Sequence, residues 1–327
     1  GVKAEQGREA DIRYCVSCNT CWRTIVEGDA LQCDNNPRVG QAKEMDWKPP
    51  RAKYKKRIVV VGSGVAGMEA AWVAAARDHQ VTVFGQSAEV GGKTRIHSLL
   101  PGGENLSSIY DYQFLKATHS NVRFEFGIRA SVQDVLSLSP DRVVLATGSR
   151  LTTPHFLADD MKDVVLGLRQ FSHELVGTLS RQKGCLVIYD QDHTEMTYAA
   201  AEYFADYFQR VVIVTTRERI ASDVSLVNRQ GVYQRLLQKR VEIVTNAQPM
   251  LESDLEAGEV TVANVVNGDQ RVIEDVVALT YATPRQPNDE LLEPLQKGLP
   301  VDAIGDCYAP RSVLTATREG HWLGVEL

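Results

Sequence analysis

Short apolar runs alternate with amphipathic segments along most of this chain, in the order expected of βαβ units. The run RIVVVG, which begins at Arg57, predicts a strand of a parallel sheet, because such strands are apolar on both faces. The alanine-rich segment 65–78 predicts a helix, and HQVTVFG (79–85) predicts the next strand. Together they make a βαβ unit of about 30 residues. Further strands are predicted at 121–127 and 142–147.

A second block of the same kind starts near Gly184. Strands are predicted at 185–190, 210–216 and 241–246, with helices at 197–208 and 232–240. Residues 260–274 predict an antiparallel hairpin that turns at Asn267-Gly268, and a strand follows at 275–283. The final segment predicts a strand, a turn at Gly305-Asp306 and a helix. The two blocks indicate two related nucleotide-type domains.

Composition excludes several classes of protein. The chain has 327 residues, of which 43% are hydrophobic and 24% charged, as is usual for globular proteins. We expect no membrane span, because no run of roughly 18 apolar residues is present. The N-terminal stretch lacks the apolar core of a secretory signal. The net charge of −6 argues against nucleic acid as the main partner.

Four of the six cysteines crowd into residues 15–33, with the spacing C-x2-C-x2-C-x11-C. One tight group in a large chain predicts a metal site in a reducing compartment such as the cytoplasm, rather than a disulfide scaffold. Four thiolates are the usual ligands of iron–sulfur clusters, and the tight triplet favours [4Fe–4S]. The predicted ligands are Cys15, Cys18, Cys21 and Cys33. Structural zinc is the alternative, although zinc prefers two separated pairs of ligands.

A glycine-rich turn between the first predicted strand and helix indicates a dinucleotide site. Residues 62–67, GSGVAG, match G-x-G-x-x-G in the strand–helix context that the motif requires. Gly62 permits the tight turn, Gly64 lets the backbone approach a pyrophosphate, and Gly67 lets helix and strand pack closely. The helix N-terminus, at Val65 and Ala66, faces the phosphates.

The acidic residue that usually binds the adenosine ribose is missing. It is expected about 20 residues after the glycine turn, at the tip of the second strand. That strand ends instead at Gly85, followed by Gln86. We expect Gln86 or Ser87 to bind the ribose, with Glu89 as a more distant candidate.

The order of the motifs resembles the C-terminal half of the trimethylamine dehydrogenase and 2,4-dienoyl-CoA reductase family of iron–sulfur flavoproteins. The resemblance covers essentially the whole chain. It rests on six segments: QGREADIRYCVSCNTC (6–21), CDNNPRVG (33–40), VVVGSGVAGMEAA (59–71), Gly91-Gly92, VVLATGS (143–149) and IGDCYAPRSVLTATREGH (304–321).

This resemblance implies roles for further residues. The four cysteines match the [4Fe–4S] ligands, and the glycine turn matches the pyrophosphate loop, with Gly92 beside it. Ala146, Thr147 and Gly148 match the ATG segment of the family. Asp306 matches the residue that approaches the FAD phosphates and ribityl chain in flavin-binding members. The cofactor implied is FAD, or the ADP moiety that some members keep.

The expected fold class is α/β in three parts. Residues 1–56 form a cysteine-rich iron–sulfur segment and a charged linker, in which Pro49 and Pro50 prevent a regular helix. Residues 57–150 and 286–327 form an FAD/NAD(P)-binding Rossmann-like domain. Residues 151–285 form an inserted, degenerate NAD(P)-type domain.

The chain departs from the family in two ways. Family members usually begin with a (β/α)8 barrel that carries FMN and the substrate, so FMN is expected on a partner barrel, as a subunit or a domain. The turn after the first strand of the inserted domain has no glycine, and Asp190, Asp192 and Glu195 would repel a pyrophosphate. A solvated surface loop is the simpler interpretation of this acidic turn.

The leading functional hypothesis is an electron-transfer module of an amine dehydrogenase or oxidative N-demethylase. It would pass electrons from the FMN through the [4Fe–4S] cluster to a protein acceptor such as an electron-transferring flavoprotein, in an oligomeric assembly. Two alternatives stay open: an NAD(P)H-dependent flavin oxidoreductase of the 2,4-dienoyl-CoA reductase type, and a non-catalytic nucleotide-binding scaffold with structural zinc. Residue spacing supports no catalytic nucleophile–His–acid group.

Overall fold

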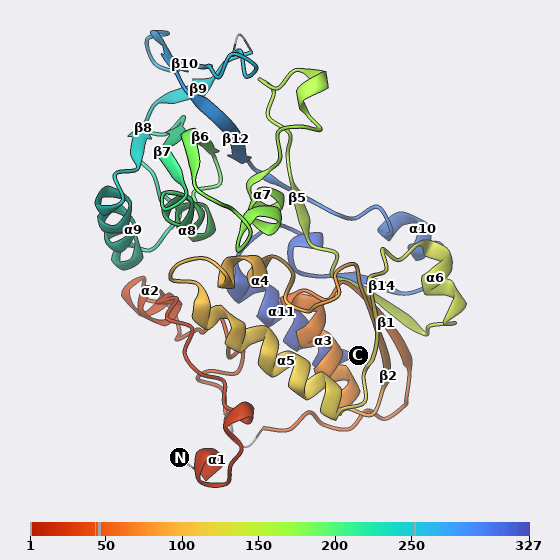
Figure 1. Cartoon of the computed structure of the whole chain (residues 1–327). Coiled ribbons are helices and arrows are strands. Elements are labelled where there is room, and N and C mark those ends of the chain that lie inside the picture. The colour runs from red at the N-terminus through yellow and green to blue at the C-terminus, as the bar shows by residue number, and fades with distance from the viewer. Residues whose placement is uncertain (1, 43, 45–46, 252) are drawn as a thin grey trace. The chain divides into compact units, whose positions relative to one another are not determined.

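A computed structural model describes residues 2–42, 44, 47–251 and 253–327 of the chain (Figure 1). The chain divides into two compact units. Unit 1 contains the residues up to Ser98, Asn105–Arg150 and Gln286–Leu327, and unit 2 contains Leu99–Glu104 and Leu151–Arg285. The chain passes from unit 1 into unit 2 through β5 (Ser149–Leu151) and returns to unit 1 through β13 (Arg285–Pro287). These two strands pair with each other.

Unit 1 is built on a five-stranded parallel sheet with the order β14-β4-β1-β2-β3. The central strand β1 is buried from Ile58 to Val61, in keeping with its unbroken apolar run. The strands are β1 (Arg57–Val61), β2 (Gln80–Gly85), β3 (Arg123–Phe126), β4 (Arg142–Leu145) and β14 (Val301–Ala303). All five were predicted from the sequence.

Helix α3 (Val65–Ala76) is the centre of the helical layer of unit 1. It is almost entirely buried, and it packs against α5 (Ser107–His119) and α11 (Val313–Glu326). Two glycines of α11 allow this close crossing: a Cβ at Gly320 would lie 2.3 Å from the carbonyl oxygen of Ala66, and one at Gly324 would lie 2.7 Å from Cβ of Val73. The smaller helices are α4 (Gly92–Ser98), α6 (Val132–Ser137) and α10 (Leu292–Gln296).

The cysteine-rich segment is less irregular than the sequence suggested. Within residues 15–42, Thr20–Val26 form the short helix α2, which includes Cys21. A second short helix, α1 (Val2–Glu5), and a 3-10 turn at Glu9–Asp11 precede the cysteines. Helix α2 is less than two turns long and has turn-forming residues on both sides, so the sequence pattern gives no helical signal for it.

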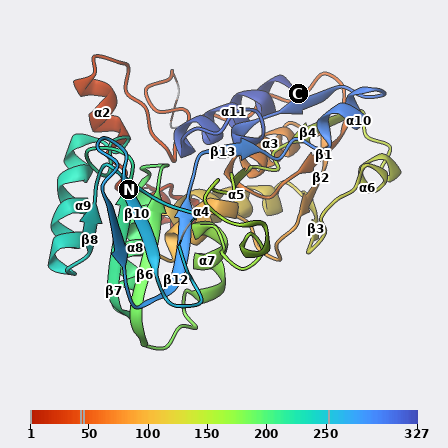
Figure 2. The same cartoon turned by 90° about the horizontal axis from the view of Figure 1, so that it is seen from above.

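Unit 2 repeats the parallel arrangement on a smaller scale (Figure 2). Its main sheet has the order β12-β6-β7-β8, with strands β6 (Gln182–Asp190), β7 (Phe208–Thr215), β8 (Glu242–Val244) and β12 (Val276–Ala282). The helices are α7 (Leu168–Leu175), α8 (Glu195–Phe204) and α9 (Leu226–Gln238). The predicted hairpin is confirmed as β10 (Val260–Asn264) and β11 (Gln270–Ile273), with β9 (Ala247–Pro249) as a third strand.

The predicted α/β fold with Rossmann-like sheets is confirmed by these two parallel sheets. Among the described residues, no helix combines the length and apolar character that crossing a bilayer requires.

Candidate functional site

The glycine turn joins β1 to α3, at the carboxyl edge of the sheet in unit 1. Two of its glycines are required by packing within the protein. Gly62 has φ +116°, and a Cβ there would lie 2.1 Å from the carbonyl oxygen of Ala146. A Cβ at Gly67 would lie 2.1 Å from the carbonyl oxygen of Gly62. The turn and the ATG segment after β4 are therefore in direct contact through their backbones.

Gly64 differs, because packing within the protein does not explain its missing side chain. It is the N-cap of α3 with φ −75° and ψ 178°, a conformation that any residue adopts. A Cβ built at Gly64 would meet no atom within 4 Å, so the space beside it is open. The positive end of the α3 dipole and its first N–H groups lie at this point. An anion such as a pyrophosphate fits this open space.

The second glycine pair lies directly beside the first motif. The backbone N–H of Gly91 donates to the carbonyl oxygen of Ser63 at 2.9 Å. A Cβ at Gly92 would lie 3.2 Å from Cα of Gly64. Gly91 and Gly92 have φ values of +107° and +52°, which favour glycine. The structure thus brings Gly92 to the open space beside Gly64.

The tip of β2 explains why no ribose-binding acid is present. A Cβ at Gly85 would lie 2.6 Å from Oγ of Ser63 and 2.9 Å from the ring of Phe126. Any side chain at Gly85 would therefore collide with the glycine turn. Gln86 follows at the same edge and is exposed, whereas Glu89 is engaged by Arg95, whose Nε donates to Oε2 at 2.9 Å.

The ATG segment continues from β4 toward the same edge. Ala146 contacts the glycine turn, and Gly148 has φ +74°. Thr147 is held by Asn288, whose Nδ2 donates to the Thr147 carbonyl oxygen at 3.1 Å, and its Oγ1 donates to the Asn288 carbonyl oxygen. Thr147 Oγ1 also lies 3.0 Å from Sγ of Cys307.

Asp306 lies in a 3-10 turn (Gly305–Cys307) between β14 and α11. Its Oδ2 accepts a hydrogen bond from Oγ of Ser149 at 2.8 Å and lies 3.6 Å from Nζ of Lys93. Its Oδ1 accepts from the backbone N–H of Arg311 at 3.0 Å. The carboxylate therefore joins the segments that follow β4 and β14 to α4. These contacts place Asp306 at the carboxyl edge of the sheet, where open α/β sheets bind ligands.

The four clustered cysteines are not assembled into a ligand set. None of the four forms a disulfide: Cys15 and Cys21 are exposed, and Cys18 and Cys33 are half-buried. Nowhere in the described ranges do three His, Cys, Asp or Glu side chains gather as they would around a metal ion. The iron–sulfur ligation thus stays a prediction.

The local chemistry nevertheless suits thiolate ligands. The N–H of Ser17 donates to Sγ of Cys15, and that of Asn36 donates to Sγ of Cys33, both at 3.4 Å. Hydrogen bonds to the sulfurs are a feature of iron–sulfur sites. Burial raises the pKa of Cys18 to about 11, with a further contribution from Asp34. Only the thiolate form of cysteine binds metal, and the raised pKa means that this form is disfavoured at Cys18. The positive charge of a bound metal would have to stabilise the thiolate.

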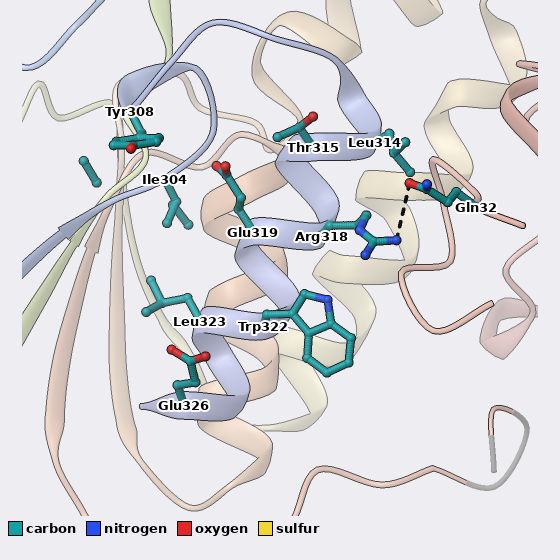
Figure 3. Close-up of a pocket in the computed structure, with 11 residues that line it drawn as sticks. Gln32, Ile304, Tyr308, Leu314, Thr315, Arg318, Glu319, Trp322, Leu323 and Glu326 are labelled. Carbon is teal, nitrogen blue, oxygen red and sulfur yellow. Dashed lines mark hydrogen bonds between the residues drawn. The ribbon is translucent and has the colours of Figure 1, made fainter. Parts of the chain in front are cut away.

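A groove that sequence reasoning missed runs along the outer side of α11 (Figure 3). It has a volume of about 490 Å³, and Trp322, Leu323 and Tyr308 contribute apolar surface to it. Gln32, the neighbour of Cys33, closes one side and accepts a hydrogen bond from Nη1 of Arg318 at 3.4 Å. The groove contains none of the predicted nucleotide-binding residues.

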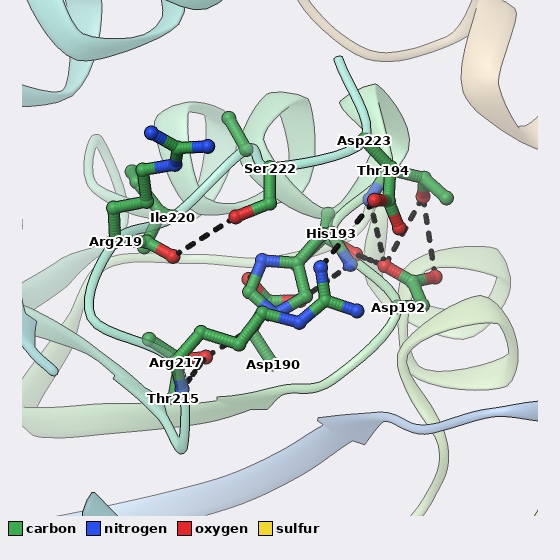
Figure 4. Close-up of polar contacts among 12 residues, drawn as sticks. Asp190, Asp192, His193, Thr194, Thr215, Arg217, Arg219, Ile220, Ser222 and Asp223 are labelled. Atoms are coloured by element: carbon green, nitrogen blue, oxygen red, sulfur yellow. Dashed lines mark hydrogen bonds and ion pairs between the residues drawn. The ribbon is translucent and has the colours of Figure 1, made fainter. Parts of the chain in front are cut away.

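The acidic turn of unit 2 is not a solvated loop, so that prediction was wrong. Asp190 is fully buried, and it accepts hydrogen bonds from the Tyr198 hydroxyl at 2.6 Å and from the His193 N–H at 3.0 Å. His193 is also fully buried, and its Nε2 lies 3.3 Å from Oγ1 of Thr215 (Figure 4). These side chains are buried in the turn between β6 and α8, the βα turn at which nucleotide-binding units of this fold class bind a pyrophosphate.

The two buried groups of this turn have shifted pKa values in opposite directions. Burial, followed by the charge of Asp192, raises the pKa of Asp190 to about 7. Burial, followed by the charge of Arg217, lowers the pKa of His193 to about 4. Both shifts favour the neutral forms of the side chains, because burial away from water disfavours a charged group.

Comparison with known proteins agrees with this architecture. Residues 56–188 match the model of the pyridine nucleotide-disulphide oxidoreductase family. A probable N-methylproline demethylase of Rhizobium meliloti (strain 1021) is 30% identical over 306 residues, which cover 91% of this chain and 43% of that protein. Histamine dehydrogenase from Rhizobium sp. 4-9 superposes with a TM-score of 0.83 at 25% identity, covering 100% of this chain and 52% of that chain.

The chain is a relative of the C-terminal part of amine dehydrogenases and demethylases. The predicted family resemblance is thereby confirmed. An NADH oxidase of Thermoanaerobacter brockii is also similar, at 28% identity over 97% of this chain and 48% of that protein. The chain spans about half the length of the curated relatives it matches.

Proposed function

We propose that this chain is the dinucleotide-binding and cluster-bearing part of an amine dehydrogenase or oxidative N-demethylase. FAD, or its ADP moiety, binds at the glycine turn of unit 1. The observation that carries this assignment is the open space beside Gly64 at the N-terminus of α3. Gly62 and Gly67 are explained by packing within the protein, but Gly64 is explained by a ligand that approaches the backbone.

The residues around this space have distinct tasks in binding. The first N–H groups of α3 bind the pyrophosphate, and the helix dipole stabilises its charge. Asp306 is oriented by Ser149 and by the Arg311 N–H, and Lys93 at 3.6 Å offsets its charge close to the phosphates. Gln86, at the tip of β2, takes the place of the usual ribose acid.

We assign Cys15, Cys18, Cys21 and Cys33 as the ligands of a [4Fe–4S] cluster. When bound, such a cluster transfers electrons one at a time, which suits the link between a flavin and a protein acceptor. The support is the spacing of the thiols and the N–H groups that donate to two of their sulfurs. An FMN-bearing barrel would supply the substrate site, because the relatives are about twice as long as this chain.

The proposal is tested by anaerobic reconstitution of the full chain. We expect about four iron and four sulfide per chain, and loss of both in Cys18→Ser and Cys33→Ser variants. Cys185, which lies in the core of unit 2, supplies the matched control as Cys185→Ser. Zinc without sulfide would overturn the cluster assignment and favour the scaffold alternative. Binding of FAD and ADP is measured in parallel, and failure of both to bind would remove the nucleotide assignment.

An NAD(P)H-dependent flavin oxidoreductase is the second candidate, because the NADH oxidase of Thermoanaerobacter brockii matches nearly the whole chain. The filled turn of unit 2 argues against a nicotinamide nucleotide at that position. Equilibrium binding of NADH and NADPH to the full chain separates the two. Micromolar binding that is unaffected at Gly64→Ala would favour the second candidate.

A further inference from the structure

One carboxylate in unit 1 is buried without contacting the nucleotide space. Glu69 lies in the middle of α3 and is fully buried. Both of its oxygens lie 3.1 Å from Nη2 of Arg13, and Gln113 Nε2 donates to Oε2 at 3.0 Å. Nδ1 of His321 lies 3.0 Å from Oε1. Although burial opposes ionisation, Arg13 and His321 lower the pKa of Glu69 to about 2.

The partners of Glu69 tie both ends of the cysteine segment to the helical layer. Arg13 precedes the first cysteine by two residues, and its Nη1 donates to the carbonyl oxygen of Asn35, two residues after Cys33, at 2.6 Å. The side chain of Asn35 is buried, and its Nδ2 donates to the Tyr14 carbonyl oxygen and to Oγ of Ser108, both at 2.9 Å. Removing one partner of such a buried charge is strongly destabilising.

The inner side of the cysteine segment packs on the nucleotide turn itself. Val16, between the first two cysteines, is 4% exposed and belongs to an apolar cluster with Val65, Leu106 and Ile109, against which Cys18 also packs. Val65 is the first residue of α3 and part of the glycine motif. Gln113 Nε2 donates both to the Val65 carbonyl oxygen, at 3.1 Å, and to Glu69.

We propose that the dinucleotide turn and the cysteine segment are energetically coupled through Val16–Val65 and Arg13–Glu69, so that nucleotide binding stabilises the closed packing of the cysteine segment. This inference rests on the proposed nucleotide site. A nucleotide that fixes the first turn of α3 also fixes the surface on which Val16 and Cys18 pack. Bound nucleotide therefore lowers the population of the open segment. By linkage, the chain binds nucleotide more tightly when the segment is closed.

The test measures alkylation of individual thiols in the full chain without added metal, using iodoacetamide and ADP as probes. Alkylation of the half-buried Cys18 is expected to depend on opening of the segment, whereas the exposed Cys15 and Cys21 react without opening and serve as references. At an ADP concentration of 100 times Kd, we expect labelling of Cys18 to slow by up to about 100-fold. The labelling rates of Cys15 and Cys21 should stay within about twofold of those without ADP.

Two variants locate the coupling. Val16→Ala removes the contact with Val65 but touches no proposed ligand contact, so ADP should still bind while protection of Cys18 falls at least about tenfold. Val135→Ala, at a fully buried residue of α6 that belongs to another apolar cluster, is the matched cavity control and should keep the protection. Glu69→Gln should abolish the protection and raise the Kd for ADP by about fivefold or more.

The outcomes separate the inference from the proposed site. If ADP binds but labelling of Cys18 does not change, the coupling is refuted and the nucleotide site stands. Equal protection in Val16→Ala and Val135→Ala would also refute the coupling. If neither ADP nor FAD binds to the full chain, the proposed site fails and the inference fails with it.

Discussion

The contrast between Gly64 and Gly67 allows ligand binding to be separated from stability within one motif. At Gly64→Ala the new Cβ meets no atom within 4 Å, and φ of −75° suits alanine. Reduced entropy of the unfolded chain favours the alanine variant by about 0.4–1 kcal/mol, and a weaker N-cap opposes it by a similar amount. We therefore expect the unfolding free energy to stay within about 1 kcal/mol of wild type.

At Gly67→Ala the new Cβ would lie 2.1 Å from the carbonyl oxygen of Gly62, so the turn has to move. Overpacking against backbone places the cost at about 3 kcal/mol or more, even though alanine favours the helix by about 1 kcal/mol. The melting temperature of a unit of this size should fall by roughly 6–12 °C. Denaturant titration and calorimetry of the full chain measure both variants.

We expect Gly64→Ala to weaken the binding of ADP although it leaves the unfolding free energy nearly unchanged. In Gly64→Ala the methyl group occupies the space through which the pyrophosphate approaches, so at least one charge-assisted hydrogen bond is lost. Such a bond contributes about 1.5–3 kcal/mol, which corresponds to a loss of affinity of at least tenfold by isothermal titration. A Gly64→Ala variant as unstable as Gly67→Ala would show that the space is not open. A stable variant with wild-type affinity would show that the pyrophosphate lies elsewhere.

Three further results are expected. In unit 2, Asp190 has a folded pKa of about 7, above its ordinary 3.8, and His193 has one of about 4, below its ordinary 6.5, so their pH dependences oppose each other. Asp190→Asn should remove the opposing aspartate contribution, so the unfolding free energy should rise more steeply from pH 4 to 6.5 than in wild type in urea titrations; an unchanged slope relative to wild type would contradict this. Gly85→Glu should destabilise the chain by about 1–3 kcal/mol because its Cβ would collide with Ser63 and with the ring of Phe126, and Ser63→Gly should recover part of that loss in a double-mutant cycle; additive effects would refute the collision with Ser63. Gly320→Ala should lower the melting temperature, because its Cβ would lie 2.3 Å from a backbone oxygen of α3; an unchanged melting temperature would mean that the two helices can separate at little cost.

The sequence was informative where the pattern is periodic. The apolar run at Arg57 predicted β1, and the alanine-rich segment predicted α3, because burial on several sides leaves few polar positions. Helix α5 was missed, since its polar and aromatic residues follow no clean helical period. A signal that could have been read was Glu69, a lone charge in an otherwise apolar helix, which indicates a buried partner.

Other features depend on pairs that lie far apart in the sequence. The glycine at position 85 is required by Ser63, more than twenty residues earlier, and no local pattern reveals that contact. The acidic turn that contains Asp190 was interpreted as solvated because its composition is polar, but Asp190 and His193 are fully buried. Their burial becomes possible only when Tyr198 and Thr215 satisfy them, and that pairing is a property of the fold.

The filled turn of unit 2 also changes how that unit depends on its surroundings. A nucleotide-binding fold gains stability in proportion to the logarithm of the free ligand concentration. In unit 2 the polar groups of the turn are satisfied by one another, through Asp190, His193 and Tyr198, and these side chains belong to the chain itself. Its stability should therefore be set by its own sequence, whereas at the proposed nucleotide site the stability of unit 1 would rise with the free nucleotide concentration.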